Sequence, residues 1–138
     1  NWGVYKDELL PLDHEKHKLP VVRQMLELYA DLPFILIGDS GESDPEIYHQ
    51  LVEEHPGRIL AIYIRNVSRT PERSEAIQAL AERVVEAGSA LVLADDSLGM
   101  ARHAVNHGWI ASQALEAVKR EKQADEGPPG EFERLVYP

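Results

Sequence analysis

The chain contains no cysteine. Disulfide bonds, a thiolate nucleophile and a zinc site with cysteine ligands are therefore excluded. Its 14 Lys and Arg residues are outnumbered by 24 Asp and Glu residues, which gives a formal net charge of −10 at pH 7. This acidic balance argues against a nucleic-acid-binding surface and against simple electrostatic docking on anionic lipid.

Long apolar runs are also missing. No stretch approaches the ~20 apolar residues that a membrane-spanning helix needs, and we expect no signal peptide. With 138 residues, 43% of them hydrophobic and 28% charged, the chain is expected to be a soluble protein with a hydrophobic core of its own. Because the first residue is Asn1 rather than Met, we expect an excised or processed piece of a longer protein.

Three short apolar runs predict β-strands, at residues 34–37, 59–64 and 90–94. Between and after them, apolar residues recur at helical spacing. The side chains expected to face the core are Leu19, Val22, Leu26 and Tyr29, then Ile47, Tyr48, Leu51 and Val52, and then Ile77, Leu80, Ala81, Val84 and Val85. Further helices are expected from Ser97 to about His107 and over 109–123, whereas residues 1–17 look irregular. Strands that alternate with helices predict an α/β fold with a parallel sheet.

The segment FILIGDSGESDPEIY, residues 34–48, joins the first strand to the next helix. Its four apolar residues suggest a strand covered on both faces, and Gly38 permits a tight exit. Ser43 and Glu46 have the spacing of a capping box that starts a helix. Asp39 and Asp44 therefore lie in one strand-to-helix loop at the carboxyl edge of the sheet, where open α/β folds bind ligands.

Two interpretations of these acids are open. Two carboxylates in one loop suit a hard cation such as Mg²⁺, which keeps several waters and bridges to a substrate phosphate. Alternatively, Asp44 only complements the dipole of the helix that it begins, and Asp39 only closes a turn.

Cations near the same edge are candidates for binding an anion. Lys18 enters the helix before the first strand, so its ammonium group could reach the loop, and Lys16 competes for this role. Arg65 directly follows the second strand and either binds an anion or pairs with one of the many acids.

Other clusters have simpler explanations. Asp95 and Asp96 follow the third strand, and capping of the next helix explains them best. His103 and His107 have a metal-ligand spacing, but without an obvious third ligand they fit a polar helix face. The group His14, Glu15 and His17 fits a solvated loop.

Taken together, GDSGESDPEIY and the upstream HK at residues 17–18 resemble the second half of the actin-patch-protein type phosphatidate phosphatase catalytic domain. That family is a branch of the haloacid dehalogenase superfamily. The resemblance extends from about Trp2 to Ile110 and weakens after Val67. It implies a three-layer, Rossmann-like parallel sheet, with residues 1–124 in the phosphatase domain and 125–138 as a tail.

The resemblance also implies a division of roles. Lys18 matches the Lys that steadies the phosphoryl group, and Asp39 and Asp44 match the acidic loop that holds Mg²⁺. We expect Ser40, Gly41 and Arg65 to contact the phosphate. The implied substrate is phosphatidate or another phosphomonoester, with peripheral membrane contact and a cytoplasmic location. Phosphoryl transfer depends mostly on positioning and charge neutralisation, which a cation, a metal and an in-line carboxylate provide.

One element of the family is absent from the sequence. The family's nucleophile is the first Asp of an Asp-x-Asp motif followed by Thr or Val, and no such motif occurs in the 138 residues. We therefore expect a domain without its N-terminal nucleophile strand, which is inactive alone. The alternative is a non-catalytic module that binds phosphate or a protein partner. A sheet without that strand exposes an apolar edge, so a homodimer is also expected.

Overall fold

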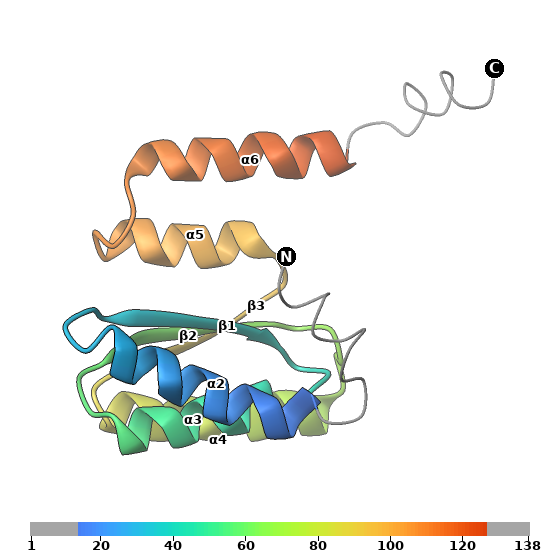
Figure 1. Cartoon of the computed structure of the whole chain (residues 1–138). Coiled ribbons are helices and arrows are strands. Elements are labelled where there is room, and N and C mark those ends of the chain that lie inside the picture. Colours follow the sequence, from blue (N-terminus) through green and yellow to red (C-terminus); the bar gives the residue numbers. More distant parts are fainter. Residues whose placement is uncertain (1–13, 127–138) are drawn as a thin grey trace. The chain divides into compact units, whose positions relative to one another are not determined.

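The computed structural model describes residues 14–126, with side chains described over 17–124. It divides into two compact units, Asn1–Asp95 and Asp96–Pro138. The elements, labelled in Figure 1, are α2 (His14–Leu28), β1 (Phe34–Asp39), α3 (Asp44–Glu54), β2 (Ile59–Arg65), α4 (Pro71–Glu86), β3 (Ala90–Ala94), α5 (Ser97–Asn106) and α6 (Ser112–Glu126).

The first unit contains a parallel sheet with the strand order β1-β2-β3. The three predicted strands are thus neighbours in the sheet, and the α/β class is confirmed. In the register, Asp39 lies beside Arg65, and Arg65 lies beside Ala94, so all three strands end at one edge. The haloacid dehalogenase type and the third layer of the fold stay predictions.

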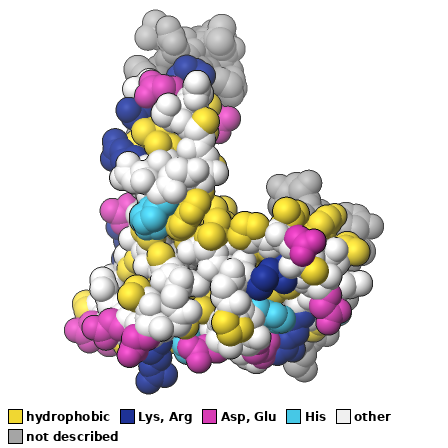
Figure 2. All heavy atoms as spheres, turned by 90° about the vertical axis from the view of Figure 1, so that its left-hand side faces the viewer, with side chains coloured by type: hydrophobic (Ala, Val, Ile, Leu, Met, Phe, Trp, Pro, Cys, Tyr) yellow, Lys and Arg dark blue, Asp and Glu magenta, His cyan; other side chains and the backbone are white. Residues whose placement is uncertain are grey.

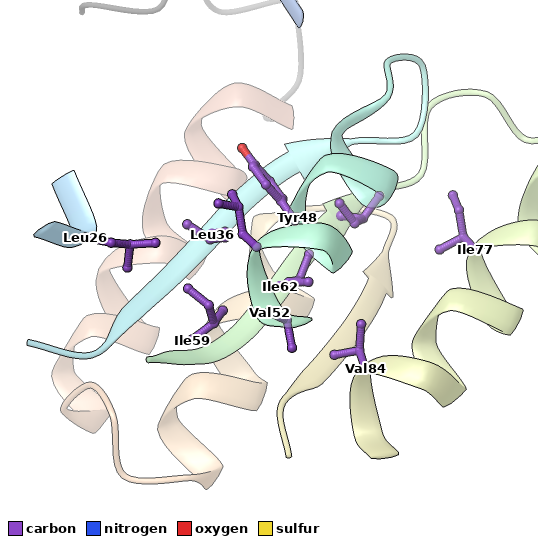
Figure 3. Packing of buried hydrophobic residues seen from close by; sticks show 10 residues of the cluster. Leu26, Leu36, Tyr48, Val52, Ile59, Ile62, Ile77 and Val84 are labelled. Carbon is purple, nitrogen blue, oxygen red and sulfur yellow. The ribbon is translucent and has the colours of Figure 1, made fainter. Parts of the chain in front are cut away.

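Helices α2, α3 and α4 cover one face of this sheet (Figure 1). Each contributes apolar side chains at helical spacing, and these meet the inward side chains of the strands in one hydrophobic cluster (Figure 3). The most buried members include Leu26 of α2, Leu51 of α3, Ile62 of β2 and Val84 of α4, which are at most 1% exposed. Removal of this apolar surface from water is the main stabilisation of the unit.

Three predicted core positions are wrong. Val85 is 62% exposed, because the buried stripe of α4 runs through Ile77 and Val84, and Val85 lies round the helix from that stripe. Ile37 is also 62% exposed, so β1 is not covered on both faces along its whole length. Tyr29 follows the end of α2 and is 46% exposed. Figure 2 shows other hydrophobic side chains at the surface, among charged ones.

Helix ends follow the sequence signals more closely. Thr70 caps α4, since its side chain accepts a hydrogen bond from the backbone N–H of Arg73. Gly88 follows the last turn of α4 with a φ of +92°, a conformation that favours glycine. One correction applies to α2, which already begins at His14. The expected loop around His14 and His17 is therefore helical.

The second unit contains α5 and α6. Asp96 caps α5 by accepting a hydrogen bond from the N–H of Gly99 at 3.1 Å, so the capping interpretation of this residue is confirmed. Its other carboxylate oxygen lies 2.6 Å from the ammonium group of Lys122 in α6. Among the described helices of either unit, none is long and apolar enough to cross a membrane.

Candidate metal- and phosphate-binding loop

The segment between β1 and α3 forms a loop at the carboxyl edge of the sheet, as predicted. β1 ends with Asp39, and α3 begins with Asp44. Ser43 occupies the N-cap position of α3, but its side chain makes no capping hydrogen bond. Glu46 binds Arg73. The predicted start of the helix is thus correct, whereas the predicted capping hydrogen bond to the Ser43 side chain does not form.

Asp44 is the buried centre of this loop, with only 3% of the residue exposed. One of its carboxylate oxygens accepts a hydrogen bond from the backbone N–H of Asp39 at 3.1 Å. The other lies 2.6 Å from Nζ of Lys18. Burial of a carboxylate is costly unless it is paired and hydrogen-bonded, and Asp44 meets both conditions.

Lys18 reaches the loop from α2, 26 residues earlier in the chain. Its side chain is 13% exposed and that of Asp44 is 5% exposed, so the pair is largely shielded from water. The structure therefore brings the expected lysine to the expected edge. Lys16, the competing candidate, lies outside the residues whose side chains are described.

Gly38 makes the position of Asp44 possible. A Cβ atom at residue 38 would lie 2.2 Å from Oδ2 of Asp44 and 2.6 Å from its Cβ and Cγ. Real side chains do not approach so closely. The glycine is thus required here because the Asp44 side chain packs directly over the end of β1.

Asp39 and Asp44 share the loop with a third acid, Glu42. One carboxylate oxygen of each lies within 4.8 Å of the others, and among the described residues this is the group of acidic or histidine side chains that could hold a metal ion. Three carboxylate oxygens match the donors that a hard cation such as Mg²⁺ prefers, so the residues fit this ion chemically. The sequence interpretation missed Glu42, although the acid stands in the same short loop as the other two.

The three expected phosphate contacts lie in or beside the loop. The hydroxyl oxygen of Ser40 accepts hydrogen bonds from the N–H groups of Val67 and Ser68, at 2.8 and 2.9 Å. The N–H of Gly41 donates to Asp39 at 3.0 Å. Arg65 is exposed at the same sheet edge. The structure thus shows Ser40 tying two loops together, and its contact with phosphate stays a prediction.

Tyr48 of α3 contacts β1 just before the loop. Its hydroxyl donates a hydrogen bond to the backbone carbonyl of Ile37 at 2.9 Å. Burial, and next the negative charge of Asp44, raise the pKa of Tyr48. The phenol therefore stays neutral and remains a donor over the physiological pH range.

The other candidates lie outside this cluster. Asp95 is exposed and lies 3.6 Å from Arg69. The rings of His103 and His107 stack at 4.2 Å, and the ring of Trp109 stacks on His107 at 4.8 Å. Neither histidine belongs to a three-ligand group among the described residues.

Comparison with known proteins relates the part of the chain that carries the loop to a phosphatase. Residues 1–66 match the family described as the catalytic domain of phosphatidate phosphatase APP1. Phosphatidate phosphatase APP1 of Saccharomyces cerevisiae is 34% identical over 73 residues, which are 50% of this chain and 12% of the yeast protein. No solved structure matches. The resemblance predicted from the sequence is confirmed, and the family match ends at residue 66, close to Val67, where we expected it to weaken.

Proposed function

Since residues 1–66 match the catalytic domain of phosphatidate phosphatase APP1, we propose that the chain is part of a Mg²⁺-dependent phosphatidate phosphatase of the haloacid dehalogenase type. The observation that carries this proposal is the largely shielded Lys18–Asp44 pair, next to the carboxylates of Asp39 and Glu42, inside the matched segment. Residues 1–124 form the C-terminal part of the phosphatase domain, and 125–138 form a tail.

In this proposal Asp39, Glu42 and Asp44 hold Mg²⁺. The ion supplies neutralisation of phosphoryl charge and a template for the substrate. Lys18 places a fixed ammonium group beside the same loop, where it binds an anionic oxygen of the substrate. Arg65, which is exposed at the same edge, provides a further cationic contact for the substrate. Because transfer of a phosphoryl group depends on such preorganised charge, these residues contribute positioning and electrostatics.

The nucleophile has to come from elsewhere. The 138 residues contain no Asp-x-Asp followed by Thr or Val. We therefore propose that the chain alone does not hydrolyse phosphomonoesters and that an aspartyl nucleophile is supplied by another segment or chain. β1 is at the edge of the described sheet, which leaves one side of this strand available for such a segment. Pairing with a second copy along the same strand, as a homodimer, stays a prediction.

The substrate class follows from the family alone. Phosphatidate is a lipid phosphomonoester, and the complete enzyme would act on it from the cytoplasm by peripheral contact with a membrane. The missing nucleophile motif favours one second candidate, a non-catalytic module that binds phosphate or a protein partner through the same loop.

A metal titration tests the proposed site. We expect the amide NMR signals of Gly41 and Glu42 to shift with Mg²⁺, with millimolar or weaker affinity, which corresponds to about −4 kcal/mol. Affinity is low because three carboxylates leave the rest of the octahedron to water. Asp39→Asn should abolish the response. Asp95→Asn is the matched control, since Asp95 is an exposed acid just after β3 at the same sheet edge. Equal losses in both variants, or no loss in Asp39→Asn, would contradict the assignment.

An activity assay forms the second part of this test. The chain alone should not release phosphate from phosphatidate or from an artificial phosphomonoester above background. Joined to an Asp-x-Asp nucleophile segment, in cis or as a second chain, it should become a Mg²⁺-dependent hydrolase in which Lys18→Ala strongly lowers turnover. Activity without that segment would refute the nucleophile argument. A joined enzyme that binds phosphate but never hydrolyses an ester would favour the non-catalytic module.

A further inference from the structure

Arg73 contacts the acidic loop although it lies outside the matched segment 1–66 and in another helix. It belongs to the first turn of α4. Its Nε donates to the backbone carbonyl of Ser40 at 3.0 Å, and its Nη2 donates to the backbone carbonyl of Glu42 at 2.9 Å. One guanidinium group thus binds the loop on both sides of Gly41.

The same guanidinium also binds the helix that follows the loop. It forms a two-pronged pair with Glu46 of α3, with distances of 2.5 Å from Nη1 to Oε2 and 3.0 Å from Nη2 to Oε1. The hydrogen bonds from Arg73 lower the pKa of Glu46 below its usual value. Arg73 therefore joins the loop that carries Asp39 and Glu42 to the helix that begins with Asp44.

The position of Arg73 is itself held by the start of α4. Thr70 caps the helix, because its hydroxyl oxygen accepts a hydrogen bond from the backbone N–H of Arg73 at 3.2 Å. The segment before it is anchored separately, because the N–H groups of Val67 and Ser68 donate to the hydroxyl of Ser40. Two independent sets of contacts thus connect residues 67–73 to the acidic loop.

We propose that Arg73 is a positioning residue of the metal loop. This inference rests on the proposed function. By holding the carbonyls of Ser40 and Glu42, Arg73 keeps the loop in the conformation in which the carboxylates of Asp39, Glu42 and Asp44 converge. It contacts none of those carboxylates in a hydrogen bond that the structure describes; its effect passes through the backbone. A loop already ordered before the metal arrives loses less entropy on binding, so affinity rises.

Arginine is required for this geometry. The planar guanidinium has five N–H donors in a fixed fork, so it can serve two carbonyls and one carboxylate at once. Lysine keeps the positive charge but presents its donors from a single nitrogen. Arg73→Lys therefore separates the hydrogen-bond geometry from the charge.

Arg58 offers a matched control within the same unit. Its guanidinium donates to the backbone carbonyls of Leu26, Tyr29 and Leu32, at distances from 2.6 to 3.2 Å. This arrangement also joins a helix to the chain around it, but at the end of the sheet where β1 starts. Arg58→Lys should therefore lower stability without changing the acidic loop.

The experiment titrates the full chain with Mn²⁺, as a paramagnetic probe of the site, and follows the broadening of the Gly41 and Glu42 amide signals. We expect Arg73→Lys to weaken Mn²⁺ binding by about 10- to 100-fold, the usual effect of removing a residue that orients metal ligands. Arg58→Lys should leave binding unchanged. Glu46→Gln keeps the contacts of Arg73 with the two carbonyls but weakens its contact with α3, so it should reduce Mn²⁺ binding less than Arg73→Lys does. This variant replaces Arg73→Lys in the experiment if Arg73→Lys does not fold.

Amide hydrogen exchange without metal provides the second measurement. The N–H of Gly41 should exchange faster in Arg73→Lys than in wild type. Its exchange rate should be the same in Arg58→Lys as in wild type. Faster exchange with no Mn²⁺ binding in any variant, wild type included, would refute the proposed metal site and the role of Arg73 in metal binding, and would show only that Arg73 orders the loop. Wild-type binding with equal effects of Arg73→Lys and Arg58→Lys, or with no effect of Arg73→Lys, would overturn the positioning role.

Discussion

Replacing Gly38 by alanine tests the packing that places Asp44. The added methyl group would lie 2.2 Å from Oδ2 of Asp44, so either the end of β1 or the Asp44 side chain has to move. Movement of Asp44 costs free energy, because the residue is only 3% exposed and its carboxylate lies 2.6 Å from the ammonium group of Lys18. Gly38→Ala should therefore affect both stability and the charged pair.

Two known effects set the limits of the expected loss in the free energy of unfolding. Overpacking in a well-packed interior costs about 1–3 kcal/mol, and removal of one partner from a buried ion pair costs about 3–5 kcal/mol. Because Asp44 can shift without losing Lys18 completely, we expect a loss between these limits, about 2–4 kcal/mol. Urea unfolding followed by far-ultraviolet circular dichroism measures it.

Gly41→Ala is the control in the same loop. Its added Cβ would lie 3.1 Å from Cγ2 of Val67, whose side chain belongs to a residue that is 43% exposed and can move aside. We expect this variant to lose less than about 1 kcal/mol, as is usual for substitutions near the surface.

A double variant tests the cause. In an Asp44→Gly background the contacts to Oδ2, Cβ and Cγ of residue 44 no longer exist, so the penalty of Gly38→Ala should shrink. If Gly38→Ala and Gly41→Ala are equally mild, or if the Gly38→Ala penalty is unchanged in the Asp44→Gly background, the close packing of Asp44 over β1 is refuted.

Two further predictions concern side chains whose hydrogen bonds stabilise the fold. Ser40→Ala should destabilise the chain by about 1–3 kcal/mol, because it leaves the N–H groups of Val67 and Ser68 without their acceptor. Urea unfolding measures this loss. A loss of only a few tenths of a kcal/mol would show that water replaces the hydroxyl. Hydrogen bonds from Arg23, and next from Gln50, lower the pKa of Glu54 to about 2. The contribution of Glu54 is therefore full above its unfolded pKa of about 4.3 and disappears as the pH falls through about 2. Glu54→Gln should cost less than about 1 kcal/mol at neutral pH, since the pair is solvent-exposed, and the difference from wild type should vanish near pH 2; a difference that persists there would contradict this linkage.

Much of the fold follows from local sequence. The apolar runs at 34–37, 59–64 and 90–94 were sufficient to predict three parallel strands, because strands buried in such sheets have continuous hydrophobic sequences. Asp39 and Asp44 were predictable at the sheet edge because they follow the first apolar run directly, whereas Glu42 of the same loop was missed. A local signal failed at the start of α3: the Ser43 side chain makes no capping hydrogen bond, and Glu46 pairs with Arg73, 27 residues later in the chain.

The sequence by itself determined the α/β class, the three parallel strands, the loop that carries Asp39 and Asp44, and the likeness to a phosphatase domain. The sequence named Lys18 as a candidate, but only the tertiary structure showed that Lys18 pairs with Asp44 and that Arg73 binds the loop. Lys18 lies 26 positions before Asp44, and the contacts of Arg73 with the loop carbonyls join residues 31 to 33 positions apart. No spacing rule links residues this far apart, because their meeting depends on how α2 and α4 pack against the sheet, which the hydrophobic core determines as a whole.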